Sequence, residues 1–406
     1  MSNLEELIER LCPDGVEYKT LTELFDTKNG YTPSKSKEEY WTNGTVPWFR
    51  MEDIRENGNI LSKAIQYVSE SAIKGSLFPA DSIIVATSAT IGQHALIKVP
   101  SLANQRFTYL VLKDEFKEQI DIMFIYYCCF KLDEYCKECL NQGNFASVDM
   151  KKFLKFKFPV PPLEVQREIV RILDNFTFLT TELAAELAAR QKQYEYYRDL
   201  LLTFKPNEST ILNERTNELE LSGAIRWMKL GDIADIGTGN GNTNEGLDTG
   251  KYPFFVRSQE IKYKNEYDFD ETAIITSGDG VGVGKIFHFV SGKYALHQRA
   301  YRVHITSDNV LPKYFFYYFK NSFLAYISKA SFHSSVTSIR RPMMINFPVP
   351  VPPLEQQKRI VDILDRFDTI CNDITSGLPA EIEARQKQYE YYRDKLLTFK
   401  ELKKEA

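Results

Sequence analysis

One run of sixteen residues occurs twice in this chain, almost unchanged. Residues 190–205 read RQKQYEYYRDLLLTFK and residues 385–400 read RQKQYEYYRDKLLTFK, with 15 of 16 positions identical. Upstream, PVPPLEVQREIVRILDNF from Pro159 matches PVPPLEQQKRIVDILDRF from Pro350 at 13 of 18 positions. The upstream blocks lie 191 residues apart and the downstream blocks 195, so the second copy carries four extra residues, within ICNDITSGLPAEIEA. The sequence therefore predicts a tandem duplication of a unit of about 190 residues.

Weaker similarity between the two copies continues upstream. Three short alignments mark it: Ser147-Val148 with Ser338-Ile339, Tyr126-Tyr127 with Tyr317-Tyr318 and, at a slightly different offset, Asn104-Gln105-Arg106 with His297-Gln298-Arg299. We therefore expect each copy to consist of a variable globular half followed by a nearly identical helical half.

Apolar residues in each helical half recur in steps of three and four. They are Val165, Ile169, Ile172, Phe176, Leu179, Leu183, Leu187, Tyr194 and Leu201 in the first copy, and Ile360, Ile363, Phe367, Ile370, Ile374, Leu378, Ile382, Tyr389 and Leu396 in the second. This spacing places one apolar seam on each helix, as in a coiled coil. A helix of ~40 residues would be ~60 Å long, far longer than an ordinary core helix. We therefore expect two long helices packed on each other, rather than two ordinary amphipathic core helices.

Proline and glycine mark where these helices should begin and break. Pro161-Pro162 and Pro352-Pro353 end the preceding strands and stand where a helix begins. Ser376-Gly377-Leu378-Pro379 should kink or restart the second helix, because proline removes a backbone donor. The polar stretch from Pro206 to Gly223 is typical of a linker.

The globular halves mix strand-like runs with helical segments and glycine turns, which predicts α+β domains. The expected strands are residues 82–87, 107–112, 273–276, 285–289 and 300–305. The glycine-rich run SGDGVGVGK does not fit a phosphate-binding loop, because Asp279 stands where the first glycine belongs and Ile286 where Ser or Thr would bind magnesium. We interpret it as a turn between strands.

Composition restricts the class of protein further. At 406 residues the chain suits two or three domains. It contains no apolar run of the ~20 residues that a membrane span needs. Six cysteines without a secretion signal favour a cytoplasmic location. Four of them, Cys128, Cys129, Cys136 and Cys139, lie in one helical pattern that cannot surround an ion, so we expect no metal site.

The charge of the chain is unevenly distributed. The net charge is −4, yet residues 280–348 contain nine lysines and arginines against one acidic residue, a local charge of +8. A local basic face can bind phosphates within an acidic protein, because salt screens charges beyond ~8–10 Å. No [D/N]PP[Y/F] tetrapeptide is present to hold a flipped adenine. We therefore expect no catalytic residues in this chain.

What remains is side-chain chemistry suited to DNA. Arginine contacts guanine with two hydrogen bonds, and asparagine or glutamine contacts adenine in the same way. The candidates in the first half are Arg50, Thr87, Ser88, Asn104, Gln105 and Arg106, with Lys151 and Lys152 on phosphates. Those in the second half are Arg257, Ser258, Gln259, Ser277, Lys285, His297, Gln298, Arg299, Arg340 and Arg341. Each of them could instead be a solvated surface residue or a local cap, and the recurring Gln-Arg pair a shared structural bridge.

The chain resembles the specificity subunits of Type I restriction–modification systems over essentially its full length. The doubled PVPPLE…Q…IV.ILD.F and RQKQYEYYRD.LLTFK motifs carry the resemblance, together with CPDGVEYKTLTELF and the TPSK…YW…G.VPW block at residues 32–48. The second half lacks the TPSK block, which implies that the two halves read different sequences.

The resemblance implies an α+β fold with pseudo-two-fold symmetry, in which two target-recognition domains are joined to two helices that form an antiparallel coiled coil. The expected boundaries are a first recognition domain at 1–158, a central spacer at 159–205, a linker at 206–224, a second recognition domain at 225–348 and a C-terminal spacer at 349–406. Each recognition domain would read one half of a bipartite double-stranded DNA target.

The resemblance also implies partners. Two modification subunits would methylate adenine with S-adenosylmethionine, and restriction subunits would translocate and cleave DNA with ATP and magnesium, so this chain itself would hold no cofactor. Three alternatives stay open: a coiled-coil scaffold that binds only proteins, a specificity module for a non-restriction methyltransferase, and a stand-alone nuclease or methyltransferase, which the missing motifs oppose.

Overall fold

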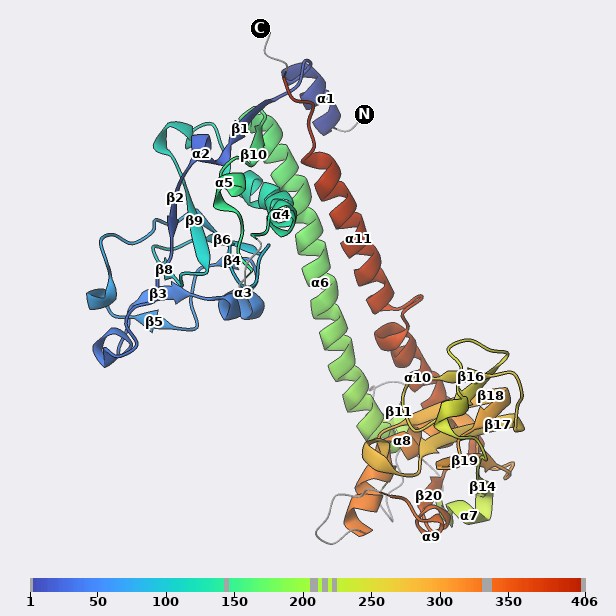
Figure 1. Cartoon of the computed structure of the whole chain (residues 1–406). Helices are drawn as coiled ribbons and strands as arrows, with labels where there is room; N and C mark the ends of the chain where they lie inside the picture. The colour runs from blue at the N-terminus through green and yellow to red at the C-terminus, as the bar shows by residue number, and fades with distance from the viewer. Residues whose placement is uncertain are drawn as a thin grey trace. The chain divides into compact units, whose positions relative to one another are not determined.

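The chain folds into two compact units in a computed structural model that describes residues 3–141, 146–204, 211–213, 218–220, 225–330 and 338–402 (Figure 1). Unit 1 comprises Met1–Glu182 and Ile382–Ala406, and unit 2 comprises Leu183–Glu381. Each unit therefore contains one globular half together with parts of both helical repeats. In the part of the chain that is described, no helix is long and apolar enough to cross a lipid bilayer.

The globular body of unit 1 is built on a five-stranded sheet of order β2-β9-β6-β7-β4, a three-stranded sheet of order β5-β3-β8 and the pair β1-β10. The strands are β1 (Glu17–Thr20), β2 (Phe25–Asn29), β3 (Val46–Phe49), β4 (Ile60–Leu61), β5 (Tyr67–Val68), β6 (Ser82–Ala86), β7 (His94–Ile97), β8 (Leu102–Ala103), β9 (Phe107–Leu112) and β10 (Lys157–Val160). The helices are α1 (Asn3–Leu11), α2 (Leu21–Leu24), α3 (Met51–Asn57), α4 (Ile122–Glu138) and α5 (Met150–Phe153), with short 3-10 turns η1 (Glu38–Tyr40), η2 (Glu70–Ala72) and η3 (Asp114–Phe116).

Unit 2 is built on a six-stranded sheet of order β14-β19-β17-β18-β15-β16 and the pair β13-β20. Its strands are β13 (Arg226–Lys229), β14 (Ala234–Thr238), β15 (Tyr252–Phe255), β16 (Lys262–Lys264), β17 (Phe269–Ser277), β18 (Phe287–Leu296), β19 (Ala300–Ile305) and β20 (Pro348–Val351). Its helices are α7 (Leu230–Ile233), α8 (Pro312–Ala330), α9 (Arg341–Ile345) and α10 (Leu354–Asn372), with η4 (Thr243–Glu245) and η5 (Gly280–Gly282). Strands β11 (Ile211–Asn213) and β12 (Glu218–Glu220) pair within the expected linker, the rest of which lies outside the described residues.

The two globular bodies share one topology. The order β2-β9-β6-β7 in unit 1 recurs as β14-β19-β17-β18 in unit 2. The register recurs as well, because Ile83 pairs with Leu110 as Ile274 pairs with Val303. The duplication inferred from the helical motifs therefore extends through both sheets. All five expected strands are present, and the glycine-rich run forms the turn η5 between β17 and β18, as predicted.

Helix α6 (Leu163–Leu202) is forty residues long and begins directly after Pro161-Pro162, as the sequence predicts. The second copy is broken into α10 and α11 (Leu378–Leu396) at the expected Ser-Gly-Leu-Pro segment. The predicted seam is wrong at Ile374, which lies in the non-helical segment 373–377 with an exposed fraction of 77%, and the seam residues Leu179 and Ile370 are also exposed, at 48% and 39%. The four extra residues of the second copy thus belong to a helix break rather than to an added turn of helix.

The helical repeats pack against each other inside each unit. In unit 1, α6 and α11 run side by side (Figure 1), and Phe176 of α6 contacts Tyr389 and Tyr392 of α11. Lys157, just before α6, pairs with Glu401, just after α11, at 2.8 Å between Nζ and Oε1, so the two helices are antiparallel. In unit 2, Phe367 of α10 contacts Tyr194 and Tyr197 of α6 in the same way.

One buried glutamine in each unit fixes the globular body to its helix. Gln166, near the start of α6, is fully buried and accepts the Asp121 N–H at 2.9 Å, while its amide donates to the carbonyls of Gln119 and Pro161. Gln357 in α10 is also fully buried and makes the matching three bonds, with the Leu311 N–H and the carbonyls of Asn309 and Pro352. Because a buried amide without partners is costly, these bonds hold the first turn of each helix against the segment that precedes α4 or α8.

The structure corrects one internal alignment. Tyr127 of α4 donates to Asp174 at 2.5 Å, and Tyr317 of α8 donates to Asp365. Tyr127 therefore corresponds to Tyr317, an offset of 190, whereas we aligned Tyr126-Tyr127 with Tyr317-Tyr318 at 191. One residue is lost between α4 and β10 relative to the second copy, because Asp174 and Asp365 keep the offset of 191.

Candidate DNA-recognition site

The recurring Gln-Arg pair lies on a short loop at the same place in both sheets. We call residues 104–106, between β8 and β9, the first recognition loop, and residues 297–299, between β18 and β19, the second. The N–H at the start of each loop donates to a strand carbonyl, Asn104 to Phe49 and His297 to Phe255, both at 3.0 Å. The arginine carbonyl at the end of each loop accepts a backbone N–H from the residue directly after a central strand. The donor is Thr87 after β6, at 3.0 Å, in unit 1 and Gly278 after β17, at 2.8 Å, in unit 2.

Each loop is also closed by its own first side chain. Asn104 accepts the Arg106 N–H on Oδ1, and His297 accepts the Arg299 N–H on Nδ1, both at 3.0 Å. These bonds satisfy the backbone inside the loop, so the glutamine and arginine side chains that follow are exposed. Two loops of different sequence thus present the same two residue types in the same geometry.

Glycines allow a neighbouring segment to approach each loop. A Cβ on Gly30 would lie 2.4 Å from the Ala103 carbonyl oxygen, and one on Gly239 would lie 1.9 Å from that of Leu296. Both distances are shorter than any real contact between these atoms. In each unit, therefore, only glycine fits where the segment after β2 or β14 crosses the recognition loop.

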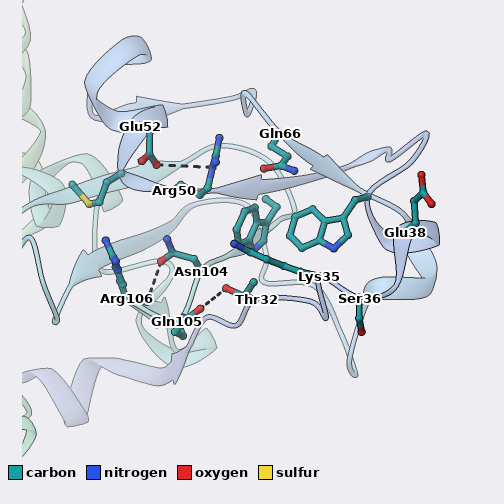
Figure 2. A pocket seen from close by; sticks show the side chains of 13 residues that line it. Thr32, Lys35, Ser36, Glu38, Arg50, Glu52, Gln66, Asn104, Gln105 and Arg106 are labelled. Carbon is teal, nitrogen blue, oxygen red and sulfur yellow. Dashed lines mark hydrogen bonds and ion pairs between the residues drawn. The ribbon is translucent and has the colours of Figure 1, made fainter.

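The first recognition loop borders a cavity of about 800 Å³, which we call the first cleft. Its lining residues are Thr32, Lys35, Ser36, Glu38, Trp41, Trp48, Arg50, Met51, Glu52, Gln66, Asn104, Gln105 and Arg106. Figure 2 shows Arg50 and Gln66 on one side and the loop residues Asn104, Gln105 and Arg106 on the other. Four predicted contact residues, Arg50 and the three of the loop, therefore come together in one cleft.

The walls of the first cleft offer planar and polar groups. Trp41 and Trp48 meet edge to face with centroids 5.0 Å apart, and both indole N–H groups donate to backbone carbonyls, at 3.0 Å to Ser34 and to Tyr31. The Arg50 guanidinium lies 5.7 Å from the Trp48 ring, and its nearest carboxylate, Glu52, is 3.9 Å from Nε. Within the described residues, Arg106 has no carboxylate at ion-pair distance. The exposed Arg106 therefore adds positive charge to a cleft whose lining includes two indole rings.

The second cleft, of about 330 Å³, lies in unit 2, and no residue of the second recognition loop lines it; Asp279 and Thr243 of its lining bond to Arg299 and His297 of that loop. It is lined by Thr243, Val256, Arg257, Ser258, Asp279, Gly280, Val281 and Gly282. Arg257 donates from Nη1 to Asp279 Oδ1 at 2.7 Å, and Arg299 donates from Nη1 to Asp279 Oδ2 at 3.1 Å. Burial raises the pKa of the Asp279 carboxyl, but the two arginines outweigh it and leave this pKa below its usual value. Asp279 is therefore ionised at neutral pH and holds both arginines.

Two histidines near the second cleft are neutral at physiological pH. Burial, and then the charge of Arg257, lower the pKa of His297 below its ordinary value. Its Nδ1 accepts from Arg299, so Nε2 carries the proton and donates to Thr243 at 3.1 Å. Burial also lowers the pKa of His288, which donates from Nε2 to the Ser258 carbonyl at 3.1 Å. Both histidines thus position neighbouring cleft residues.

The remaining predicted contact residues divide into buried and exposed positions. Thr87 and Ser277 are buried, and their hydroxyls bond to Thr108 at 3.0 Å and to the Asp279 carbonyl at 2.8 Å. Ser88 is half-buried, in a bridge with Ser147. Gln298 is exposed and donates to Asn242 at 2.6 Å. Gln259 is exposed. The predicted lysines and arginines that are also exposed are Lys151 and Lys152 in α5, Lys285 after η5, and Arg340 and Arg341 at the start of α9.

Sequence reasoning missed several residues that line the clefts. Trp41, Trp48, Lys35 and Gln66 border the first cleft, and Thr243 and Asp279 the second. The TPSK…YW…VPW block contained three of them, so this block could have indicated a site. Nothing in the linear sequence connects Gln66 or Asp279 to the recognition loops. In the described part of the chain, no cluster of three or more His, Cys, Asp or Glu could hold a metal ion.

Comparison with known proteins gives a consistent result. The family model "Type I restriction modification DNA specificity domain" matches residues 13–190 and 225–384. The chain is 39% identical over 387 residues to the EcoprrI specificity subunit of Escherichia coli, covering 92% of each chain. It is 34% identical over 291 residues to the EcoR124I/EcoR124II specificity subunit of the same species, covering 63% of this chain and 68% of that one.

Solved structures show the same fold. A chain from work on "complex assembly and conformational transition of the type I R-M system" superposes with a TM-score of 0.59 at 16% identity, covering 95% of this chain and 98% of that one. The HsdS subunit of Thermoanaerobacter tengcongensis superposes with a TM-score of 0.54 at 17% identity, covering 95% and 97%. The expected α+β fold, with two sheet-rich bodies and packed long helices, is thereby confirmed.

Proposed function

Because the chain belongs to the family of Type I restriction–modification specificity subunits, we propose that each of its units reads one half of a bipartite DNA target through its recognition loop and cleft. As a specificity subunit it recognises the DNA target within its complex, and catalysis belongs to the partner subunits. The observation that carries the proposal is the recurrence of Gln105-Arg106 and Gln298-Arg299 on equivalent loops.

The chemistry of these loops suits base edges. An arginine fork donates two hydrogen bonds to the O6 and N7 of guanine, and a glutamine amide can bond both groups of an adenine edge. Arg106 and Arg299 are exposed, and Gln105 and Gln298 precede them. The surroundings differ, because the first cleft contains two tryptophans and the second contains Asp279. The two halves are therefore proposed to read different half-sites.

Phosphate contacts are proposed for a second repeated element. The short helices α5 and α9 lie at an offset of 191 and directly follow the segments that bridge to the central strands, at Ser147 and Ser338. Each begins with exposed cations, Lys151-Lys152 in one and Arg340-Arg341 in the other. Phosphate contacts position a reader on DNA without carrying sequence information.

Modified-base sequencing of genomic DNA tests the assignment. In cells that express the complex, Gln298→Ala with Arg299→Ala should relax the modified sequence in one half of the target only. Gln105→Ala with Arg106→Ala should relax the other half. Loss of one bidentate base contact costs roughly 1–3 kcal/mol of discrimination.

Lys320→Ala, on α8, serves as a charge-matched control, which should leave the modified sequence unchanged. Variants that fold and assemble yet modify the unaltered target would show that the recurring pair is a structural bridge.

We propose that two modification subunits dock on the helical repeats at two equivalent tyrosines. Tyr196 and Tyr391 have exposed fractions of 64% and 62% and occupy the same position of the repeat. Each meets the following tyrosine edge to face, with centroids 5.5 Å and 5.3 Å apart, and that second tyrosine stacks on Phe367 or Phe176. Large exposed apolar residues repeated in this way are typical of a protein interface.

Native mass spectrometry of the chain mixed with its modification subunit tests the docking. Tyr196→Ala or Tyr391→Ala alone should reduce the bound modification subunits from two to one, and the double variant should bind none. Tyr263→Ala, an exposed tyrosine of β16, should leave two bound. Two bound subunits in the double variant would place the interface elsewhere.

The remaining partners follow from the family. We infer that restriction and translocase subunits join the methylating complex, that S-adenosylmethionine, ATP and magnesium belong to the partners, and that the complex works in the cytoplasm. The six cysteines support this location, because all of them are free and buried.

A further inference from the structure

The second cleft differs from the first in how its arginines are held. One carboxylate, Asp279, binds Arg257 on Oδ1 at 2.7 Å and Arg299 on Oδ2 at 3.1 Å. The two arginines come from different segments, one after β15 and one from the second recognition loop. Their side chains stay 39% and 62% exposed, while that of Asp279 is 24% exposed. The carboxylate is therefore the inner member of the cluster, and the guanidinium groups are the outer ones.

The backbone fixes Asp279 in this place. Gly278 donates to the Arg299 carbonyl at 2.8 Å and accepts from Ile339, and the Ser277 hydroxyl donates to the carbonyl of Asp279 at 2.8 Å. A Cβ on Gly278 would lie 2.6 Å from the Arg299 carbonyl oxygen, so a larger residue at 278 would push this segment away from the loop.

The first unit lacks this carboxylate. The bridge Asp279–Ser338 corresponds to the bridge Ser88–Ser147, both at an offset of 191, so Ser88 stands where Asp279 does. Arg106, the counterpart of Arg299, has no carboxylate at ion-pair distance within the described residues. The duplicated fold therefore forms the recognition loop without an acidic residue at this position, which indicates that Asp279 has a role other than folding.

We propose that Asp279 is a specificity-positioning residue, which aims Arg257 and Arg299 together at the second half-site; this rests on the proposed function of the second cleft. Each arginine uses Nη1 on the carboxylate, which leaves its other N–H groups available for a guanine edge or a phosphate.

Two measurable effects follow if Asp279 positions the two arginines as well as adding a negative charge. An arginine that Asp279 already holds loses less conformational entropy when it binds the correct base. The complex should therefore discriminate better between correct and incorrect bases. The carboxylate also neutralises part of the local positive charge, so attraction to DNA of any sequence falls. Removing Asp279 should therefore weaken discrimination and strengthen nonspecific binding at the same time.

The test uses the complex with its modification subunits and four labelled duplexes: one with the target found by modified-base sequencing, two with a base change in only the first or only the second half-site, and one without the target. Asp279→Ser, which copies the first unit, and the isosteric Asp279→Asn should each lower discrimination at the second half-site roughly tenfold. Discrimination at the first half-site should not change. Binding of the target-free duplex should tighten, with a salt dependence steeper by about one unit of slope.

The mirror variant provides a matched control. Ser88→Asp adds a carboxylate beside Arg106 and should weaken binding of the target-free duplex. If Arg257→Ala or Arg299→Ala relaxes the second half-site while Asp279→Ser and Asp279→Asn do not, positioning by Asp279 is refuted and the proposed function stands. If none of these variants affects the second half-site, the assignment of the second cleft itself is wrong.

Discussion

The ring of Phe176 stacks on that of Tyr392, with centroids 5.5 Å apart and planes 23° from parallel. The second copy repeats this contact between Phe367 and Tyr197, at 5.6 Å and 26°. In both units a phenylalanine from the start of one helical repeat meets a tyrosine from the end of the other. The near-identity of the doubled motifs is explained by this exchange, because each motif must fit its counterpart in the other copy.

The contact between Phe176 and Tyr392 should contribute to the free energy of unfolding of unit 1 only. Phe176→Ala should lower the free energy of unfolding by about 2 kcal/mol, less than for a fully buried ring. In a double-mutant cycle, Phe176→Ala with Tyr392→Ala should show coupling of about 1 kcal/mol. Phe176→Ala with Tyr197→Ala should show none, since Tyr197 lies in unit 2. Equal coupling in the two cycles, measured by urea denaturation, would refute the pairing.

The buried glutamines should be among the least replaceable residues. Gln166→Leu leaves the Asp121 N–H and two carbonyls without partners, and Gln357→Leu does the same in unit 2. Each change should cost about 3 kcal/mol or more. Gln191→Leu, at an exposed position of α6, should change stability by less than about 0.5 kcal/mol. Chemical denaturation compares the three variants, and similar losses in all of them would contradict the network.

The buried histidines make unit 2 sensitive to mild acid. Burial lowers the pKa of His288 and of His297, so below the unfolded value of about 6.5 the unfolded chain binds protons more readily than the folded one. Stability is therefore full above that pH and falls as the pH drops through it. His288→Gln, which keeps a donor for the Ser258 carbonyl, should reduce the fall in Tm between about pH 7.5 and pH 5.5. An unchanged fall would exclude His288 as a source.

The cysteines should be chemically silent in the native chain. All six are buried, and burial raises the pKa of Cys128 and Cys129 well above normal and that of Cys136 to about 12. The thiolate is the reactive form, so a colorimetric thiol reagent should label the folded protein slowly. In denaturant it should label six thiols. Rapid labelling of several thiols without denaturant would contradict the burial of this cluster.

The sequence predicted the elements that repeat or that follow backbone chemistry. The doubled motifs, the Pro-Pro helix starts and the Ser-Gly-Leu-Pro break each depend on local residues, and the structure contains all of them. The recurring Gln-Arg pair was also found, because duplication supplied a second copy for comparison. The constant spacing between the two copies aligns equivalent residues correctly wherever neither copy has gained or lost a residue.

The sequence failed where the outcome depends on contacts distant along the chain. Ile374 fits the apolar period, yet it is exposed because the helix ends at Asn372. Asp279 joins Arg257 and Arg299 only after three strands have paired, and Gln66 reaches the first cleft from a loop before β5. No local pattern distinguishes these residues from ordinary surface positions.

We propose that the long helices of this chain set the separation of its two readers on DNA. Helix α6 runs without interruption from unit 1 into unit 2, through the segment TELAAEL. Repeating Ala184-Ala185-Glu186-Leu187 after Leu187 would lengthen α6 by ~6 Å and turn it only ~40° past a full revolution. The apolar seam of α6 therefore stays nearly in phase.

Modified-base sequencing of genomes from cells carrying this insertion is the most direct test. We predict that both half-site sequences stay unchanged while the unspecified spacer between them lengthens by one or two base pairs, at ~3.4 Å each. A two-residue insertion at the same place rotates the seam by ~200° and should abolish assembly. Full activity with an unchanged spacer would contradict the claim that these helices set the distance.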